Sequence, residues 1–396
     1  ERNKNALERI HSSADIVYIY ESDLTQKYYK FASRMSKFGN KTAWPLYQTL
    51  IYPIYAAFNN LVYQKFKPDV EKGKYDIVHA ITPMIPRYPV KLVKACNKAD
   101  VPFIIGPVNG GVPFPKGFKK VAHQEFAYFN FLRLIGRKII PGYGETYEKA
   151  TQILAGSTYT LNLVKDLFNI SDEQIQLFYE NGVNKDFLKE PTSQKNATNI
   201  EKGLLPLELL FVGRLVPYKG ADLLLDALSC LDISIKRNLR LTVVGDGSER
   251  TTLEQQVRAL QLKEIVRFTG WVTQAETKEY YSKADVFCFP SVREFGGAVV
   301  LEAMANALPC IVVNNGGIGE YVTSNAGFKV EPISREYVIQ ELTKYITLLF
   351  KDDDLRKSMS INSQKRVQEF EWSEKAKKIV NIYQEVIALK EKAKKQ

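Results

Sequence analysis

The sequence predicts an α/β protein in which two doubly wound domains follow one another along the chain. Its 396 residues, 45% of them apolar and 25% charged, suffice for two cores of ordinary domain size. From residue 207 onward, continuous apolar runs alternate with segments of helical period. Residues 189–203 are polar and lack apolar periodicity, which is typical of a linker. We therefore expect a domain boundary near residue 195.

Five apolar runs indicate the strands of the second domain, residues 196–372. Runs this rich in β-branched residues suit strands buried on both faces, and their alternation with helices indicates parallel strands joined by crossovers. Ligands of such sheets bind beyond the carboxyl ends of the strands. The expected strands are Leu207–Val212, Leu239–Val244, Ile265–Phe268, Val286–Phe289 and Pro309–Val313.

The first domain, residues 1–195, shows the same alternation more faintly. The chain begins without a strand ahead of its first helix, which indicates that the first strand is absent from this sequence. A final helix over residues 373–396 is basic at its end and could pack on either domain, including back on the first. Strands of the first domain are expected at Ile16–Tyr20, Ile77–Ala80, Phe103–Ile105 and Gln152–Ala155.

Several classes of protein are disfavoured by composition. No apolar run of about 18 residues occurs, and the first ten residues are charged, so neither a spanning helix nor a secretory signal is visible. The four cysteines lie far apart in sequence, which favours reduced thiols and a cytoplasmic protein. Three histidines without ligand spacing give a metal site no support. The acidic run Asp352–Asp354 sits between helices and is expected to cap one of them.

The net charge of +11 lies in the first part of the chain. Residues 1–150 carry 23 Lys and Arg against 12 Asp and Glu, which is the whole surplus. Such a surface suits nucleic acid, an anionic membrane or a phosphorylated acceptor, and a merely solvated surface is an equal alternative. Two aromatic and basic amphipathic stretches, Trp44–Phe66 and Phe118–Tyr143, could likewise dock on a membrane or pack on the first sheet.

A turn with two cations follows the first strand of the second domain. Arg214 and Lys219 lie between Val212 and a helix that begins near Ala221. Such a turn feeds the free N–H groups of a helix N-terminus, and a guanidinium with an ammonium adds charge neutralisation. The turn therefore suits a phosphate group, although solvated loop charges would give the same pattern.

A second loop joins glycines and glutamates in a comparable place. Gly296 and Gly297 open a helix after the strand Val286–Phe289, and glycines let backbone N–H groups approach a diphosphate. Glu294 lies before the glycines and Glu302 one to two turns into the helix. We expect one carboxylate at each end of a sugar diphosphate, with helix capping and surface charge as the alternative.

Together these segments resemble the retaining GT-B glycosyltransferases of family four. The resemblance is carried by Gly213-Arg214, Lys219-Gly220, Gly245-Asp246-Gly247 and the stretch from Glu294 to Ala305, and it extends from about Leu207 to Val330. It is weaker in the first half, at Tyr75–His79 and Asn181–Val183. The resemblance implies the GT-B fold, two Rossmann-like domains whose parallel sheets face each other across a cleft.

The resemblance also implies roles for individual residues. Arg214 and Lys219 would hold the donor diphosphate in place of a metal ion, and Glu294 would bind the hydroxyls of the transferred sugar. The donor would be a UDP- or GDP-linked hexose, and no cofactor is implied. Donor-binding positions would be Gly213, Val272, Phe295, Gly296, Gly297, Ala298 and Glu302, with Val272 near the base and Glu302 on the ribose.

The acceptor side is less determined. Where many relatives have a histidine, this chain has Asn109, followed by Gly110 and Gly111, which could present donors to an acceptor or form a plain turn. The resemblance implies a glycan or lipid-linked acceptor, synthesis of a surface polysaccharide or glycolipid, and possible peripheral contact with the inner face of an anionic membrane, without nucleic acid. Two alternatives stay open: a nucleotide-sugar epimerase of the same fold, and a non-enzymatic basic α/β binding protein.

Overall fold

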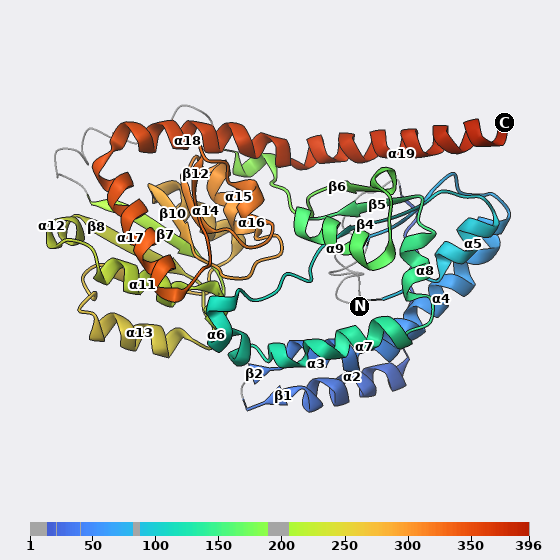
Figure 1. Cartoon of the computed structure of the whole chain (residues 1–396), viewed down its shortest axis with the longest axis horizontal. Coiled ribbons are helices and arrows are strands. Elements are labelled where there is room, and N and C mark those ends of the chain that lie inside the picture. Colours follow the sequence, from blue (N-terminus) through green and yellow to red (C-terminus); the bar gives the residue numbers. More distant parts are fainter. Residues whose placement is uncertain (1–13, 21, 40, 82–87, 189–205, 396) are drawn as a thin grey trace.

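The structure is a computed structural model that describes residues 14–395 except 21, 40, 82–87 and 189–205. Its described part contains two parallel sheets, one in each half of the chain, set side by side along the long axis (Figure 1). The predicted domain boundary near residue 195 lies outside the described residues.

The second sheet has six parallel strands in the order β12-β11-β10-β7-β8-β9. Strand β7 is central because the chain first builds outward through β8 and β9 and then returns to add β10 on the other side. Three strands, β7, β8 and β10, have the predicted bounds, and β9 and β11 differ by one or two residues. The strands are β7 Leu207–Val212, β8 Leu239–Val244, β9 Val266–Gly270, β10 Val286–Phe289, β11 Cys310–Val313 and β12 Gly327–Val330.

Helices cover both faces of this sheet, as right-handed crossovers between parallel strands require. They are α11 Ala221–Ser229, α12 Ile233–Arg237, α13 Arg250–Ala259, α14 Gln274–Lys283, α15 Ala298–Ala305, α16 Ile318–Tyr321, α17 Arg335–Lys351 and α18 Asp353–Val367, with short 3-10 turns η5 Pro217–Lys219 and η6 Gln368–Phe370. As predicted for the acidic run, Asp352 caps α18, because its carboxylate accepts the N–H of Leu355 at 2.9 Å.

The first sheet has four parallel strands in the order β3-β4-β5-β6. Its strands are β3 Val78–Ala80, β4 Phe103–Val108, β5 Gln152–Ala155 and β6 Ile175–Leu177, and a two-residue hairpin pairs β1 Lys37–Phe38 with β2 Lys41–Thr42. Its helices are α2 Asp23–Met35, α3 Trp44–Leu50, α4 Tyr52–Glu71, α5 Leu92–Lys98, α6 Lys119–Gln124, α7 Phe131–Ile139, α8 Tyr143–Glu148 and α9 Thr158–Phe168, with 3-10 turns η1 Lys116–Phe118, η2 Ala127–Asn130, η3 Asp172–Gln174 and η4 Lys185–Phe187.

One predicted strand of the first half is wrong. Ile16–Tyr20 adopts no regular structure, and Ile16, Val17 and Tyr20 are exposed because no described strand pairs with this segment. Four strands of the described part were not predicted, and all of them are short and carry few β-branched residues: β1, β2, β6 and β12. The four cysteines are free thiols, three of them buried, as the sequence indicated.

The last helix, α19 Trp372–Lys395, covers one face of the first sheet after leaving the second domain (Figure 1). Alternating side chains of a strand point to opposite faces. Ile104 and Leu154 therefore pack against Ile382 and Val386 of α19, while Ile105 and its neighbours pack in the main core of the first domain. The Tyr383 hydroxyl also lies 2.7 Å from the Nδ1 atom of His79, whose Nε2 atom lies 2.9 Å from the carbonyl oxygen of Gly106.

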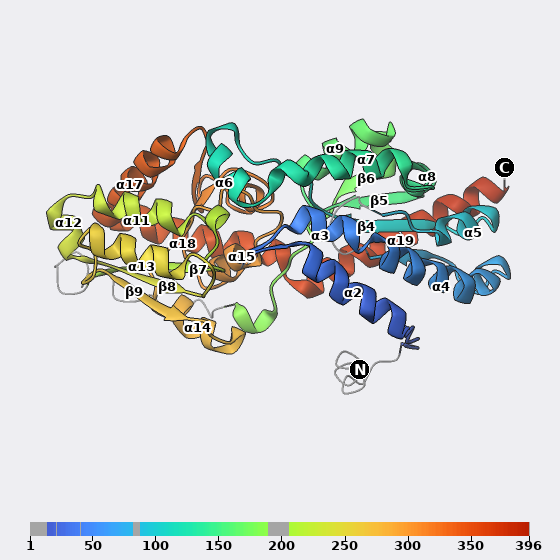
Figure 2. The same ribbon diagram turned by 90° about the horizontal axis from the view of Figure 1, so that it is seen from below.

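The two domains also meet at the side where their strands end. Phe118, from the first half of the chain, is buried in the core of the second domain. Hydrogen bonds cross the junction from Arg293 Nε to the Val112 carbonyl at 2.8 Å and from the Thr158 N–H to Glu320 at 2.9 Å. The segment after β4 is therefore held against the second domain (Figure 2).

The amphipathic stretches of the first half form separate helices rather than two long ones. Trp44–Phe66 contains α3 and most of α4, whereas Phe118–Tyr143 is broken into α6, η2 and α7. Among the described residues, no helix combines the length and the apolarity needed to cross a membrane.

The packing of α19 gives a testable expectation for stability. Replacing Ile382, which is 7% exposed, with alanine leaves a cavity against Ile104 and Leu154 and is expected to lower the free energy of unfolding by about 2 to 4 kcal/mol. The matched variant Val380→Ala, on the exposed side of the same helix, is expected to change it by less than about 0.5 kcal/mol. Urea denaturation followed by circular dichroism measures both. Equal losses would show that α19 does not pack on the first sheet in solution.

Candidate active site

The candidate site lies beyond the carboxyl ends of β7 and β10, which are neighbours in the second sheet. These two strands pair in parallel, so the loops that follow them start at the same edge. The order of the sheet reverses between them, because β8 and β9 extend from β7 whereas β11 and β12 extend from β10. Open α/β sheets bind their ligands at this kind of switch point.

The loop after β7 brings Lys219 to Glu294 of the loop after β10. Their side chains form an ion pair and are only 12% and 13% exposed. The Lys219 ammonium also lies 5.0 Å from the centre of the Phe289 ring. Arg214 is exposed, and its Nη2 atom donates to the Tyr218 hydroxyl at 2.8 Å. The predicted cationic pair thus stands at the site, with Lys219 bound to a carboxylate and Arg214 open to solvent.

Two neighbouring glycines of the second loop lead into the helix α15. Gly297, with a φ of +61°, precedes α15, and a Cβ atom there would lie 2.4 Å from Ile318. A Cβ atom on Gly296 would lie 2.2 Å from the Glu180 carboxylate. Neither glycine has a side chain, so the backbone between Phe295 and Ala298 leaves the start of α15 unshielded at these two positions. The N–H of Gly213, in contrast, is occupied by the Val244 carbonyl at 3.0 Å.

Glu302 lies apart from Glu294, inside α15. Its carboxylate accepts the Tyr281 hydroxyl of α14 at 2.9 Å, and burial raises the pKa of this carboxyl above its usual value. A hydrogen bond from Gln274 acts against that rise in pKa. Because Val272 comes two residues before Gln274, the structure places Val272 and Glu302 at the same end of α14. Val272 itself is half-buried and packs on the core of the second domain.

Asn109 connects the first domain to the glycine loop. It is buried, and its side-chain amide donates to the Phe295 carbonyl at 3.0 Å. The amide oxygen accepts the Ser157 hydroxyl at 3.1 Å, and the Gly110 N–H donates to the Thr160 hydroxyl at 3.0 Å. Asn109 therefore holds the two domains together at this point. Gly111, with a φ of +78°, packs against Leu163 and leaves no room for a side chain.

Three charged residues of the site were missed by the sequence analysis. Burial raises the pKa of Glu180 and of Glu125, and it lowers the pKa of Arg293, whose guanidinium lies between the rings of Phe114 and Phe295. Glu180 precedes the segment Asn181–Val183, which was noted for its resemblance and could have drawn attention to it. Arg293 is adjacent to Glu294 in sequence, whereas no sequence signal indicates Glu125.

These groups form one charged cluster around the two loops. Burial raises the pKa of Tyr218, and the negative charges of Glu294 and Glu125 add to that rise. For Glu125, the positive charges of Arg293 and Arg214 oppose the rise in pKa that burial causes. Within the described part of the chain, no group of three or more His, Cys, Asp or Glu side chains could hold a metal ion. The arrangement can bind an anion through side-chain cations and bare backbone N–H groups.

Comparison with solved structures confirms the predicted fold class. The chain matches the crystal structure of HepE from Anabaena in complex with UDP with a TM-score of 0.58 and 20% identity, covering 83% of this chain and 82% of that one. It matches the sucrose-phosphate synthase of Thermosynechococcus elongatus with a TM-score of 0.56 and 20% identity, covering 95% of this chain and 82% of that one. The two parallel α/β domains have the GT-B arrangement.

Comparison of sequences agrees for the second domain. Residues 194–366 match the family described as glycosyl transferases group 1, so this part of the chain carries a group 1 domain. An uncharacterized glycosyltransferase of Methanocaldococcus jannaschii is 30% identical over 247 residues, 61% of each protein. The D-inositol 3-phosphate glycosyltransferase of Kineococcus radiotolerans is 31% identical over 192 residues, 45% of this chain and 44% of that protein. The chain thus matches less than two thirds of the length of either relative.

Lys375 at the start of α19 provides a pH test of this region. Burial lowers its pKa from 10.5 to about 8, aided by Lys378 and opposed by the nearby Glu180, and its ammonium donates to the Tyr179 carbonyl. Between these two pKa values the unfolded chain keeps the proton that the folded protein has lost. Stability therefore rises with pH in that window.

The pH dependence of the free energy of unfolding is compared with that of Lys375→Met, a variant that has no titratable group at this position. The free energy of unfolding of the unmodified protein is expected to rise relative to the variant by up to about 3 kcal/mol between pH 8 and 10.5. Denaturant titrations at several pH values measure this difference. A constant difference across the window would show that Lys375 is solvated and titrates normally.

Proposed function

We propose that the chain is a glycosyltransferase that moves a hexose from a UDP- or GDP-linked donor to an acceptor hydroxyl, with retention of anomeric configuration and without a metal ion. The proposal rests on one observation above all: Lys219, Arg214 and the bare backbone at Gly296–Gly297 meet at the ends of β7 and β10 within a group 1 domain. The same match favours neither a nucleotide-sugar epimerase nor a non-enzymatic binding protein.

Donor binding would use the two ends of the site differently. The diphosphate lies at Lys219, Arg214 and the N-terminus of α15, where cations and backbone N–H groups are available. Lys219 then exchanges the Glu294 carboxylate for a phosphate oxygen, and the hydroxyls of the sugar donate to Glu294. The ribose hydroxyls take the place of Tyr281 on Glu302, and the backbone near Val272 receives the base.

The reaction breaks the bond between the anomeric carbon and the phosphate oxygen. The electron pair of that bond leaves with the nucleoside diphosphate, and the acceptor oxygen bonds to the anomeric carbon on the same face. The acceptor proton passes to the departing phosphate, so no side chain needs to act as nucleophile. Lys219 and Arg214 stabilise the charge that grows on the leaving group, which is where a pre-placed cation lowers the barrier most.

The acceptor would approach from the first domain. Asn109, Gly110 and Gly111 stand on that side, with Asn109 positioning the loop through Phe295 rather than binding a ligand itself. A glycan or a lipid-linked saccharide is the proposed acceptor class, and synthesis of a surface polysaccharide or glycolipid at the inner face of a membrane is the proposed setting.

The leaving-group role is tested by replacing Lys219 with alanine. We expect kcat to fall by roughly 10² to 10³ with a UDP- or GDP-hexose, because a pre-placed donor to the transition state is removed. Release of the nucleoside diphosphate, measured by a coupled assay, reports the rate.

The control is Lys283→Ala, which removes an ammonium whose side chain is 75% exposed on α14. Its rate is expected to equal that of the unmodified protein. If Lys219→Ala retains the full kcat while remaining folded, the ammonium does not act on the leaving group and the proposed mechanism is wrong.

A further inference from the structure

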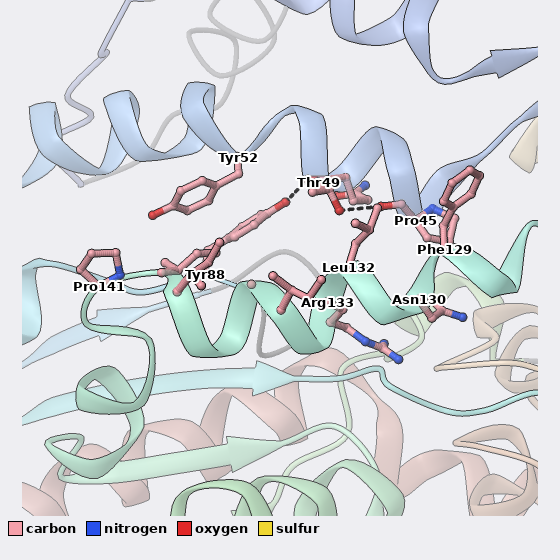
Figure 3. A pocket seen from close by; sticks show the side chains of 14 residues that line it. Pro45, Thr49, Tyr52, Tyr88, Phe129, Asn130, Leu132, Arg133 and Pro141 are labelled. Carbon is pink, nitrogen blue, oxygen red and sulfur yellow. Dashed lines mark hydrogen bonds between the residues drawn. The ribbon is translucent and has the colours of Figure 1, made fainter.

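A cavity of about 370 Å³ lies in the first domain between α3, the start of α4 and α7 (Figure 3). Its size falls in the range of small-molecule pockets, about 300 to 1,000 Å³. The walls are aliphatic and aromatic, and Leu132, Ile135 and Ile139 of α7 face Pro45 and Tyr52 of the opposite helices. Nothing in the proposed donor chemistry uses this cavity.

Two hydroxyl groups of the wall are already hydrogen-bonded within the protein. The Tyr88 hydroxyl donates to the Gln48 carbonyl, and the Thr49 hydroxyl donates to the Pro45 carbonyl at 2.9 Å. Both hydroxyl protons therefore stay within the protein. A saccharide bound there would leave most of its hydroxyl groups against carbon atoms and without hydrogen-bond partners. A hydrocarbon chain has no hydrogen bonds to lose and is stabilised by leaving water.

Arg133 gives the cavity one charged end. Its stem lines the cavity, and Figure 3 shows its guanidinium group turned away from α3. Within the described residues, the buried Nε and Nη1 atoms of Arg133 and the Nε atom of Arg137 have no hydrogen-bond partner. Burial, with Arg137 as a second cause, lowers the pKa of Arg133. A cation left unpaired in this way is costly, so the site favours an anion between the two arginines.

The charged end adjoins the candidate active site. Burial lowers the pKa of Arg293, and the positive charge of Arg133 is a second cause, so the two guanidinium groups lie within electrostatic range of each other. Arg293 in turn contacts Phe295, the residue before the glycines. An anionic head group at Arg133 would therefore stand beside the domain interface, where the acceptor hydroxyl has to meet the donor sugar.

Two residues of the cavity wall, Ile135 and Ile139, also belong to an exposed apolar surface of α7. None of the residues of α7 is buried, and Phe131, Leu134, Ile135 and Ile139 are between 46% and 70% exposed. Lys138 lies in its last turn. An exposed apolar strip beside a basic residue suits contact with anionic lipid, from which a single lipid chain can enter the cavity.

From this geometry we propose that the cavity binds the hydrocarbon chain of a lipid-linked acceptor and that Arg133 and Arg137 bind its phosphate. The inference rests on the proposed glycosyltransferase function and names the acceptor as a lipid phosphate. The chain lies between α3 and α7, the phosphate lies at the inner end, and the saccharide extends toward the donor site.

Gly136 allows the cavity to be filled without strain. It lies in α7 on the cavity wall, and a Cβ atom there would approach only the flexible Ile140 side chain, at 3.4 Å. Leucine at this position also favours the helix. The matched control is Ser358→Leu, which adds the same side chain to an exposed position of α18.

The probe is dodecyl phosphate, titrated calorimetrically below its micelle concentration. The unmodified protein and Ser358→Leu are expected to bind it equally, and Gly136→Leu at least about tenfold more weakly, because the chain loses its space. Arg133→Gln is expected to weaken dodecyl phosphate about tenfold and leave neutral dodecyl maltoside unchanged, because only the phosphate loses a charged partner.

Three results would overturn the inference: no binding of dodecyl phosphate, equal binding by Gly136→Leu, or equally tight binding of inorganic phosphate alone. Binding of UDP and GDP, measured in the same variants, separates this question from the proposed function. Gly136→Leu should bind a nucleoside diphosphate as the unmodified protein does. If the unmodified protein binds dodecyl phosphate but neither nucleotide, the glycosyltransferase proposal fails while the lipid pocket stands.

Discussion

The ion pair between Lys219 and Glu294 is the interaction on which the candidate site depends. It joins two loops 75 residues apart in sequence, and it forms because β7 and β10 pair in parallel and end at the same edge. Both side chains are largely withdrawn from water, so neither can lose its partner without a replacement. The site is thus polarised by a cation and a carboxylate that a ligand must satisfy together.

This constraint favours a ligand with both a negative and a hydroxylated part. A diphosphate alone would capture Lys219 and leave Glu294 beside a new negative charge, with the Glu180 carboxylate already nearby. A sugar attached to that diphosphate supplies hydroxyl groups that donate hydrogen bonds to Glu294, and these replace the contact with Lys219. For the proposed donor, discrimination between a nucleotide sugar and a free nucleotide would follow from this ion pair, and not only from contacts added on binding.

The sequence predicted the elements and site residues that depend on local patterns. It did not predict residues that reach the site through contacts between segments distant in sequence. Apolar runs and glycines gave β7, β8 and β10 with their bounds and identified Lys219, Glu294 and Gly297, because each belongs to one strand, turn and helix. Glu180 and Glu125 come from segments whose approach to the site depends on how the domains pack. Ile16–Tyr20 has the composition of a strand but pairs with no described strand. The strand predicted there from local propensity alone was therefore wrong.

The contacts between the domains connect the proposed donor region to the first domain. Asn109 and Arg293 bind carbonyl groups across the junction, and both contact Phe295, which directly precedes the glycines. A shift of the first domain would therefore move the backbone that faces the proposed diphosphate position. After burial, Arg133 of the first domain is the next cause of the lowered pKa of Arg293. Because Arg293 lies between the two binding regions, an anion at Arg133 would relieve repulsion within this cluster and so support the loop that holds the donor.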